Sequence, residues 1–110
     1  MRPHRFAMIA AAFIGASCTA PPAVPGSEDG STDPDLVRGR EIWGTSCASC
    51  HAPDGSGGRG PSLASVEVRF PLLGDQVLLV AGGRGSMPGF GGRYSLAELE
   101  AVVRYTREVL

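Results

Sequence analysis

A glycine-rich middle section is the feature that most constrains the fold of this chain. Of the 110 residues, 16 are Gly and 9 are Pro, and aromatic residues make up only 6%. Residues 51–63 read HAPDGSGGRGPSL, a composition typical of a long loop rather than of a helix or a strand. A small domain with so little apolar bulk usually depends on a metal, on disulfides or on a bound group. The sequence therefore predicts one small domain that is stabilised by something besides its own side chains.

Helical patterns flank this loop on both sides. Asp33 is an N-cap candidate followed by Pro34, and the first helix is predicted to run from there to about residue 45. The last helix starts at the capping box Ser95-Leu96-Ala97-Glu98 and carries a mostly apolar stripe as far as residue 109. Both ends of the domain are therefore predicted to be helical.

The stretch between these helices is less regular. Residues 75–81 (DQVLLVA) predict a middle helix that two glycines stop, at positions 82 and 83. The only alternating run, VEVR over residues 66–69, is too short to predict a strand. We therefore predict an all-α fold.

The motif Cys47-Ala48-Ser49-Cys50-His51 indicates what the domain binds. C-x-x-C-H is the attachment motif for c-type haem. The two thiols add to the two vinyl groups at one porphyrin edge, and the adjacent imidazole binds the iron. We therefore predict one covalent haem c, with Cys47 and Cys50 as its thioether residues and His51 as an axial iron ligand.

Three other interpretations of these cysteines compete with haem. A structural zinc site needs four ligands, and the only other Cys and His are Cys18 and His4, which lie outside the domain. A thioredoxin-like C-x-x-C follows a strand, whereas a helix is predicted here. A simple disulfide between Cys47 and Cys50 leaves His51 without a role. Haem accounts for all three residues.

Met87 is the candidate for the second axial ligand. It is the only Met after the N-terminal region, and it lies in the loop Gly85-Ser86-Met87-Pro88-Gly89. A lone Met is most often core filler, but a loop this rich in Gly and Pro is a poor place for one. We therefore expect the Met87 thioether to bind the iron, which raises the potential relative to ligation by two imidazoles.

Residues 34–110 resemble the class I c-type cytochromes of the short bacterial, cbb3-type or c551-like, kind. The resemblance rests on C-x-x-C-H, on Gly60-Pro61-Ser62-Leu63, and on Met87-Pro88 followed by a terminal helix. It implies a cytochrome c fold of three to four helices wrapped around the haem. It also implies that the Pro61 carbonyl accepts the Nδ1 hydrogen of His51 and that Leu63 packs on the haem face.

The resemblance implies a helix crossing as well. Gly39 and Trp43 in the first helix match the positions that cross the last helix, where Val102 and Tyr105 are their expected partners. A glycine at such a crossing permits close approach of two backbones.

The resemblance further implies a one-electron carrier that docks transiently with redox proteins. Two filled axial positions leave no place for a substrate, so we expect no enzyme activity. The alternatives are a haem-based sensor or peroxidase-like protein with a displaceable Met87, a cytochrome subunit of a larger respiratory complex, and a structural lipoprotein without haem.

The N-terminal region predicts export. Residues 1–17 combine a basic start with an apolar run that is too short to span a bilayer, which indicates an export signal. Gly15-Ala16-Ser17-Cys18 resembles a lipobox, with cleavage before Cys18 and lipidation of its sulfur, although Gly15 departs from that pattern. Ordinary cleavage that leaves a plain thiol is the alternative. Residues 18–33 are predicted to be a flexible tether, so the mature protein is expected on the extracytoplasmic face or in the periplasm, anchored by lipid.

Charge is unevenly distributed along the chain. Removal of residues 1–17 takes away two Arg and no acid, which changes the net charge from −1 to −3. Residues 26–54 hold six acids and two Arg, whereas residues 55–94 hold four Arg and two acids. No Arg-rich stripe appears, so nucleic-acid binding is excluded. Arg59, Arg84 and Arg93 are candidates for haem propionate contacts or for solvated side chains.

Overall fold

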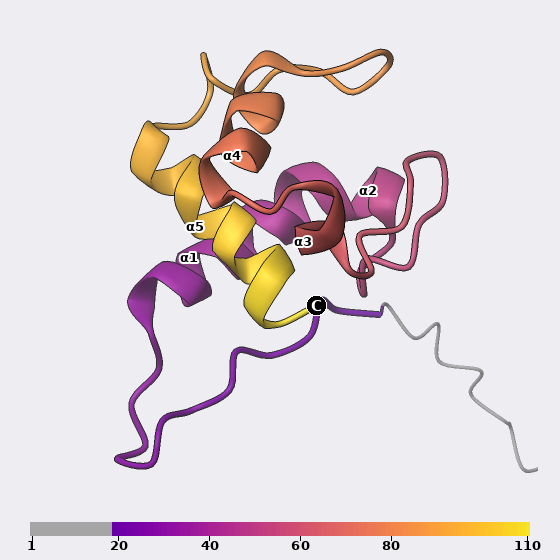
Figure 1. The fold of residues 1–110 in the computed structure, drawn as a ribbon. Coiled ribbons are helices and arrows are strands. Elements are labelled where there is room, and N and C mark those ends of the chain that lie inside the picture. The colour runs from indigo at the N-terminus through magenta and orange to yellow at the C-terminus, as the bar shows by residue number, and fades with distance from the viewer. Residues whose placement is uncertain (1–18) are drawn as a thin grey trace, which may run out of the picture.

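The computed structural model describes residues 19–110, in which five α-helices and one π-helical turn enclose a small core (Figure 1). The elements in chain order are α1 Pro34–Ile42, η1 Trp43–Cys47, α2 Ala48–His51, α3 Val66–Arg69, α4 Leu73–Gly82 and α5 Leu96–Glu108. The only β pairing within residues 19–110 is a single bridge between Arg84 and Met87. The predicted all-α class is confirmed.

The N-terminal predictions fall largely outside the described part of the chain. The predicted export signal over residues 1–17 and the predicted lipidation site Cys18 lie outside residues 19–110. Among the helices that are described, none is long and apolar enough to cross a membrane.

Helices α1 and α5 cross in the centre of the molecule, and a glycine sets how closely they approach. A Cβ at Gly39 would lie 2.2 Å from the carbonyl oxygen of Ala101 and 2.9 Å from Cβ of Tyr105. One turn further along α1 and η1, the ring centroids of Trp43 and Tyr105 are 6.4 Å apart. The crossing expected from Gly39 and Trp43 is present.

Helix α5 supplies side chains to two hydrophobic clusters. The first packs α1 and η1 against α5 through Ile42, Trp43, Val102 and Tyr105. The second packs α4 and the following loop against α5 through Val77, Phe90, Leu99 and Val103. This helix is therefore the central element, and Figure 1 shows α1 and α4 on different sides of it.

Two elements differ from the sequence prediction. The first helix is predicted to end near residue 45. Instead α1 ends at Ile42, and the helical segment continues without a break through the π-helical turn η1 and through α2 to His51. The alternating run at residues 66–69 forms the single helical turn α3. In a strand Val66 and Val68 would share a face, but Val66 is 2% exposed and Val68 is 76% exposed.

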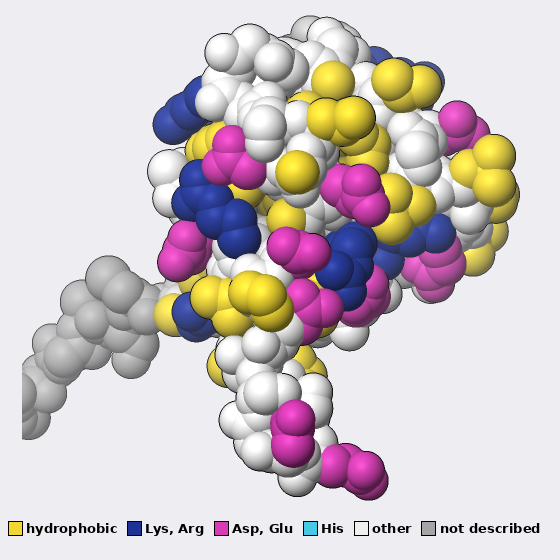
Figure 2. Space-filling view, turned by 90° about the vertical axis from the view of Figure 1, so that its left-hand side faces the viewer, with side chains coloured by type: hydrophobic (Ala, Val, Ile, Leu, Met, Phe, Trp, Pro, Cys, Tyr) yellow, Lys and Arg dark blue, Asp and Glu magenta, His cyan; other side chains and the backbone are white. Residues whose placement is uncertain are grey.

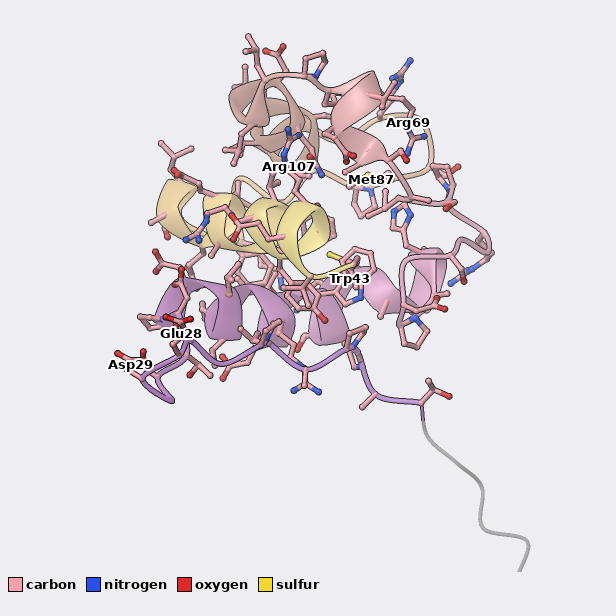
Figure 3. All side chains as sticks on the ribbon, turned by 60° about the horizontal axis from the view of Figure 1, so that its bottom comes forward. Glu28, Asp29, Trp43, Arg69, Met87 and Arg107 are labelled. Carbon is pink, nitrogen blue, oxygen red and sulfur yellow. The ribbon has the colours of Figure 1, made fainter. Side chains whose placement is uncertain are left out.

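The predicted tether is partly packed against the domain. The carbonyls of Pro21 and Pro22 accept hydrogen bonds from Arg40, and Val24 packs against the first hydrophobic cluster. The following residues form an exposed loop whose turn is closed by a hydrogen bond from the Ser31 amide to the Asp29 carboxylate, 2.9 Å long. Figures 2 and 3 show this acidic loop protruding from the body of the molecule.

Candidate functional site

The predicted site residues meet in one cavity of about 680 Å³. Its walls are formed by η1, α2, α3, α4 and α5, and by the loops after α2 and between α4 and α5. The six residues proposed from the sequence all line it, namely Cys47, Cys50, His51, Pro61, Leu63 and Met87. A volume of this size is within the range of cofactor and small-molecule sites in proteins.

His51 is held in one orientation at the end of α2. Its side chain is buried, at 8% exposed, and its Nδ1 lies 2.8 Å from the carbonyl oxygen of Pro61. A carbonyl oxygen only accepts, so Nδ1 carries the hydrogen and Nε2 keeps its lone pair. That is the tautomer an imidazole needs to bind a metal through Nε2.

The backbone of the glycine-rich loop leaves just enough room for this imidazole. A Cβ at Gly60 would lie 2.6 Å from Cε1 and 2.8 Å from Nδ1 of His51. Gly60 immediately precedes Pro61. A side chain at position 60 would collide with the His51 ring and keep the Pro61 carbonyl from approaching Nδ1. Contact with His51 therefore explains why position 60 of this loop is a glycine.

Trp43 supports His51 from the helical side. The two ring centroids are 6.0 Å apart, and Trp43 Nε1 donates a 2.9 Å hydrogen bond to the carbonyl oxygen of Pro53. Trp43 is the first residue of the π-helical turn η1. This turn ends at Cys47, the first residue of the C-x-x-C-H motif, and the rest of the motif forms α2. Turns of this kind are frequent at functional sites, and here the turn continues α1 into the helix that carries His51.

The two thiols lie at the cavity wall as free cysteines. Burial, with a smaller contribution from Cys50, raises the pKa of the Cys47 thiol to about 11. The thiol of Cys47 is therefore uncharged at neutral pH. A thioether at the same place is also uncharged, so covalent attachment there buries no charge.

Met87 reaches the cavity from a tight turn. The amides and carbonyls of Arg84 and Met87 exchange two hydrogen bonds of 3.0 Å across Gly85 and Ser86. Gly83, at φ 77°, precedes this turn, and a Cβ there would lie 2.6 Å from the carbonyl oxygen of Met87. Met87 and Trp43 both line the cavity, and Figure 3 shows that they come from separate parts of the fold.

The arginines at the cavity differ from the prediction in one respect. Arg59 and Arg84 line the cavity and are exposed, so both remain candidates for a propionate contact. Arg93 is not among the lining residues, and its guanidinium lies 5.4 Å from the centroid of the Tyr94 ring. Arg69 lines the cavity instead and donates a 2.6 Å hydrogen bond to the carbonyl oxygen of Ser62.

A buried polar network at the cavity is not evident from the sequence. Gln76 is 4% exposed, its amide donates a 2.9 Å hydrogen bond to Thr106, and both residues line the cavity. Arg107 donates to the Gln76 amide oxygen and to the carbonyl oxygen of Phe70. Gln76 stands in an apolar run, DQVLLVA, and nothing in that pattern indicates that its amide points inward.

The residues present fit a covalently attached haem. Two free thiols, an imidazole fixed by its Nδ1 hydrogen bond and a thioether surround one cavity with mainly apolar walls. Within residues 19–110, no three His, Cys, Asp or Glu side chains gather as a metal ion held by protein alone would need. The donor set is that of a cofactor which brings its own equatorial ligands.

Comparison with known proteins agrees with this geometry. Residues 34–105 match the family described as cytochrome c oxidase, cbb3-type, subunit III. Cytochrome c6 from Synechococcus sp. (strain ATCC 27167 / PCC 6312) is 30% identical over 79 residues, which cover 64% of this chain and 67% of that protein.

Solved structures give the same result. Cytochrome c6 from the diatom Phaeodactylum tricornutum is similar with a TM-score of 0.55 and 30% identity, over 66% of this chain and 90% of that one. The c-type cytochrome NirC gives a TM-score of 0.54 at 28% identity, over 64% of this chain and 87% of that one. Cytochrome cL from Hyphomicrobium denitrificans gives 0.51 at 25%, over 66% of this chain and 46% of that one.

The family match covers more than half of the chain, and the helices, the C-x-x-C-H residues and the cavity agree with it. The chain belongs to this family and is a class I c-type cytochrome with one covalent haem c.

Proposed function

We propose that this cytochrome is a one-electron carrier with His51 and Met87 as its axial ligands. The observation that carries the proposal is the fixed His51 imidazole, whose Nδ1 is bound by the Pro61 carbonyl while Met87 lines the same cavity. When bound, the haem iron supplies a site that accepts and releases one electron. Two protein ligands leave no open position for a substrate, which argues against catalysis.

The residues of the chain have separate tasks in this function. Cys47 and Cys50 would hold the porphyrin edge, and the Pro61 carbonyl accepts the Nδ1 hydrogen of His51, which leaves Nε2 free to bind iron. Trp43 and its hydrogen bond to Pro53 limit movement of the helix that carries His51. A site held this rigidly needs little rearrangement when its charge changes, which favours fast electron exchange.

Replacement of Met87 tests the axial ligation. We expect the oxidised protein to show the long-wavelength absorption band of a sulfur–iron bond, and Met87→Ala to lose this band and to bind CO rapidly when reduced. Met87→His should keep both axial positions filled and lower the reduction potential, because thioether ligation raises it. Ser86→Ala, at the neighbouring exposed position, is the matched control.

The opposite result would favour a different function. Rapid CO binding by the unaltered reduced protein, without the long-wavelength band, would contradict ligation by Met87. It would support the sensor or peroxidase-like alternative instead.

We also propose that the protein works outside the cytoplasmic membrane, as a lipoprotein anchored at Cys18. Support comes from the signal-like residues 1–17, the lipobox-like residues before Cys18 and the covalent haem attachment. The intact mass of the exported protein should equal that of a chain beginning at Cys18 plus haem plus acyl groups. A mass without the acyl groups would contradict the anchor and leave the haem assignment intact.

A second candidate function is that of a cytochrome subunit in a respiratory complex. The observation that favours it is the family match, which carries the description of an oxidase subunit. Purification in mild detergent from native membranes distinguishes the two. Co-migration with integral membrane proteins would favour the subunit, whereas a lone cytochrome would favour the free carrier that docks transiently.

A further inference from the structure

The chain just before α1 is docked onto the helical domain. We call residues 21–24 the N-terminal strap. The Arg40 guanidinium donates 2.8 Å and 2.9 Å hydrogen bonds to the carbonyls of Pro21 and Pro22. The Tyr105 hydroxyl donates a 2.6 Å hydrogen bond to the Pro22 carbonyl. Two separate helices, α1 and α5, therefore hold the strap through its backbone carbonyls.

The strap completes the core at this place. Tyr105 is buried, at 0% exposed, and its hydroxyl donates a hydrogen bond to the Pro22 carbonyl. Undocking of the strap would break this hydrogen bond and expose the apolar surface beneath the strap to water. Val24 packs against the cluster that contains Tyr105 and Trp43. Prolines also lose little conformational entropy when they dock.

The strap also contacts the η1 turn. A Cβ at Gly44 would lie 3.4 Å from Cγ of Pro21, an ordinary van der Waals distance, so the Pro21 ring lies over this residue of η1. The strap therefore touches α1, η1 and α5.

The strap and the cavity lie on different sides of the molecule. None of Arg40, Gly44 and Tyr105 lines the cavity. Figure 3 shows the strap running along α1 on the side away from Arg69 and Met87, which do line it. The strap also lies outside residues 34–105, the part of the chain that matches the family.

We propose that the strap is a rigid link, which fixes where the chain leaves the domain and thereby orients the haem cavity. A flexible tether over residues 18–33 would have a span of roughly 20 Å and let the domain turn freely. With residues 21–24 docked, only the short stretch from position 18 to Pro21 is left, a reach of about 10 Å. The cavity side, with Arg69 and Met87, then faces away from the surface to which the N-terminus is attached.

Orientation of the cavity relative to a lipid surface rests on the proposed anchor at Cys18. Docking of the strap does not depend on that anchor, so docking and orientation are tested separately.

The docking test uses the haem-loaded protein with Cys18→Ser and a nitroxide on Ala23→Cys, an exposed position within the strap. We expect an immobilised spectrum. The double variant Tyr105→Phe/Arg40→Met removes the donors while keeping the aromatic ring and an unbranched side chain, and it should convert the spectrum to the mobile form. Arg38→Met is the matched control, because Arg38 is also on α1 but pairs with Glu41 and Glu98.

Unchanged haem absorption in each variant shows that it has folded. A mobile nitroxide on Ala23→Cys in the otherwise unaltered domain would overturn the proposal, as would an immobile one in the double variant.

The orientation test uses the lipid-modified chain in phosphatidylcholine vesicles that carry a paramagnetic chelate on some headgroups. Nitroxides at Thr45→Cys and at Ser86→Cys are compared, because Thr45 is exposed on the domain next to Gly44, which Pro21 contacts, whereas Ser86 is at the cavity. Stronger relaxation at Thr45→Cys, lost in the double variant, supports the oriented link. Equal relaxation at both positions overturns it. A protein without lipid would contradict the proposed anchor, and the nitroxide spectra would still decide whether the strap is docked.

Discussion

Among the glycines of residues 19–110, Gly39 is the one at which an added Cβ would come closest to another atom. Its backbone faces Ala101 and Tyr105 of α5, and the nearest atom, a carbonyl oxygen of helical backbone, cannot move aside as a flexible side chain would. Ala is ordinarily the better helix residue by about 1 kcal/mol. Close packing of two backbones outweighs that preference here.

We therefore expect Gly39→Ala to reduce the free energy of unfolding by about 1–3 kcal/mol, the usual cost of overpacking. Urea unfolding of the haem-loaded protein measures it. Gly74→Ala is the matched control, because Gly74 lies in α4 and a Cβ there would meet nothing within 4 Å, so it should be neutral or slightly stabilising. Equal effects of the two substitutions on the free energy of unfolding would contradict the close approach of α1 and α5 at Gly39.

At the scale of elements, α5 depends on its N-terminal cap. The Ser95 hydroxyl accepts from the Glu98 amide, and the Glu98 carboxylate accepts from the Ser95 amide, at 3.2 Å and 3.1 Å. The capping box expected from the sequence is thus formed. Because α5 contributes to both hydrophobic clusters, fraying of its first turn loosens the core as well.

Ser95→Ala removes the acceptor for the Glu98 amide and should lower the free energy of unfolding by about 1 kcal/mol. Thermal unfolding of the haem-loaded protein, followed by circular dichroism, measures the loss. Ser95→Asp keeps a capping oxygen and should restore most of the stability. If Ser95→Asp were as unstable as Ser95→Ala, the cap would not be the cause.

For the whole molecule, ion pairs tie α1 to α5 at two places. Arg104 of α5 donates a 2.8 Å hydrogen bond to Asp33, the N-cap of α1, and Arg38 of α1 pairs with Glu98 of α5. The hydrogen bond from Arg104, followed by those from the backbone, holds the pKa of Asp33 below its usual value. The hydrogen bond from Arg38 acts in the same direction on the pKa of Glu98.

A carboxylate with a lowered pKa in the folded state stabilises the protein above its unfolded pKa, and this contribution is lost as the pH falls through the folded value. We therefore expect thermal stability to fall below about pH 4, near the unfolded pKa of these acids. Asp33→Asn and Glu98→Gln should each reduce this acid dependence. Glu100→Gln, an exposed position on α5 without an ion pair in the described residues, should leave it unchanged. Parallel acid curves for all four proteins would contradict the assignment.

Local chemistry was enough to identify much of this cytochrome. C-x-x-C-H specifies its cofactor because the spacing is set by one porphyrin edge. The Ser95 capping box and the Asp33 cap each depend on residues within one helical turn, so both could be predicted. Met87 could be proposed by elimination, as the only methionine after the N-terminal region.

The remaining features depend on contacts between residues far apart in the chain. Residues 66–69 form a helical turn in which Val66 is buried in the core and Val68 is exposed. The four-residue pattern VEVR does not indicate which of the two valines is buried. Gln76 points inward because Thr106 and Arg107, thirty or more positions away, bind its amide. Pro21 and Pro22 dock because Arg40 and Tyr105 bind their carbonyls, and a backbone carbonyl is the same in every sequence. Pairings of that kind are set by the packing of the helices, since no residue type marks them in advance.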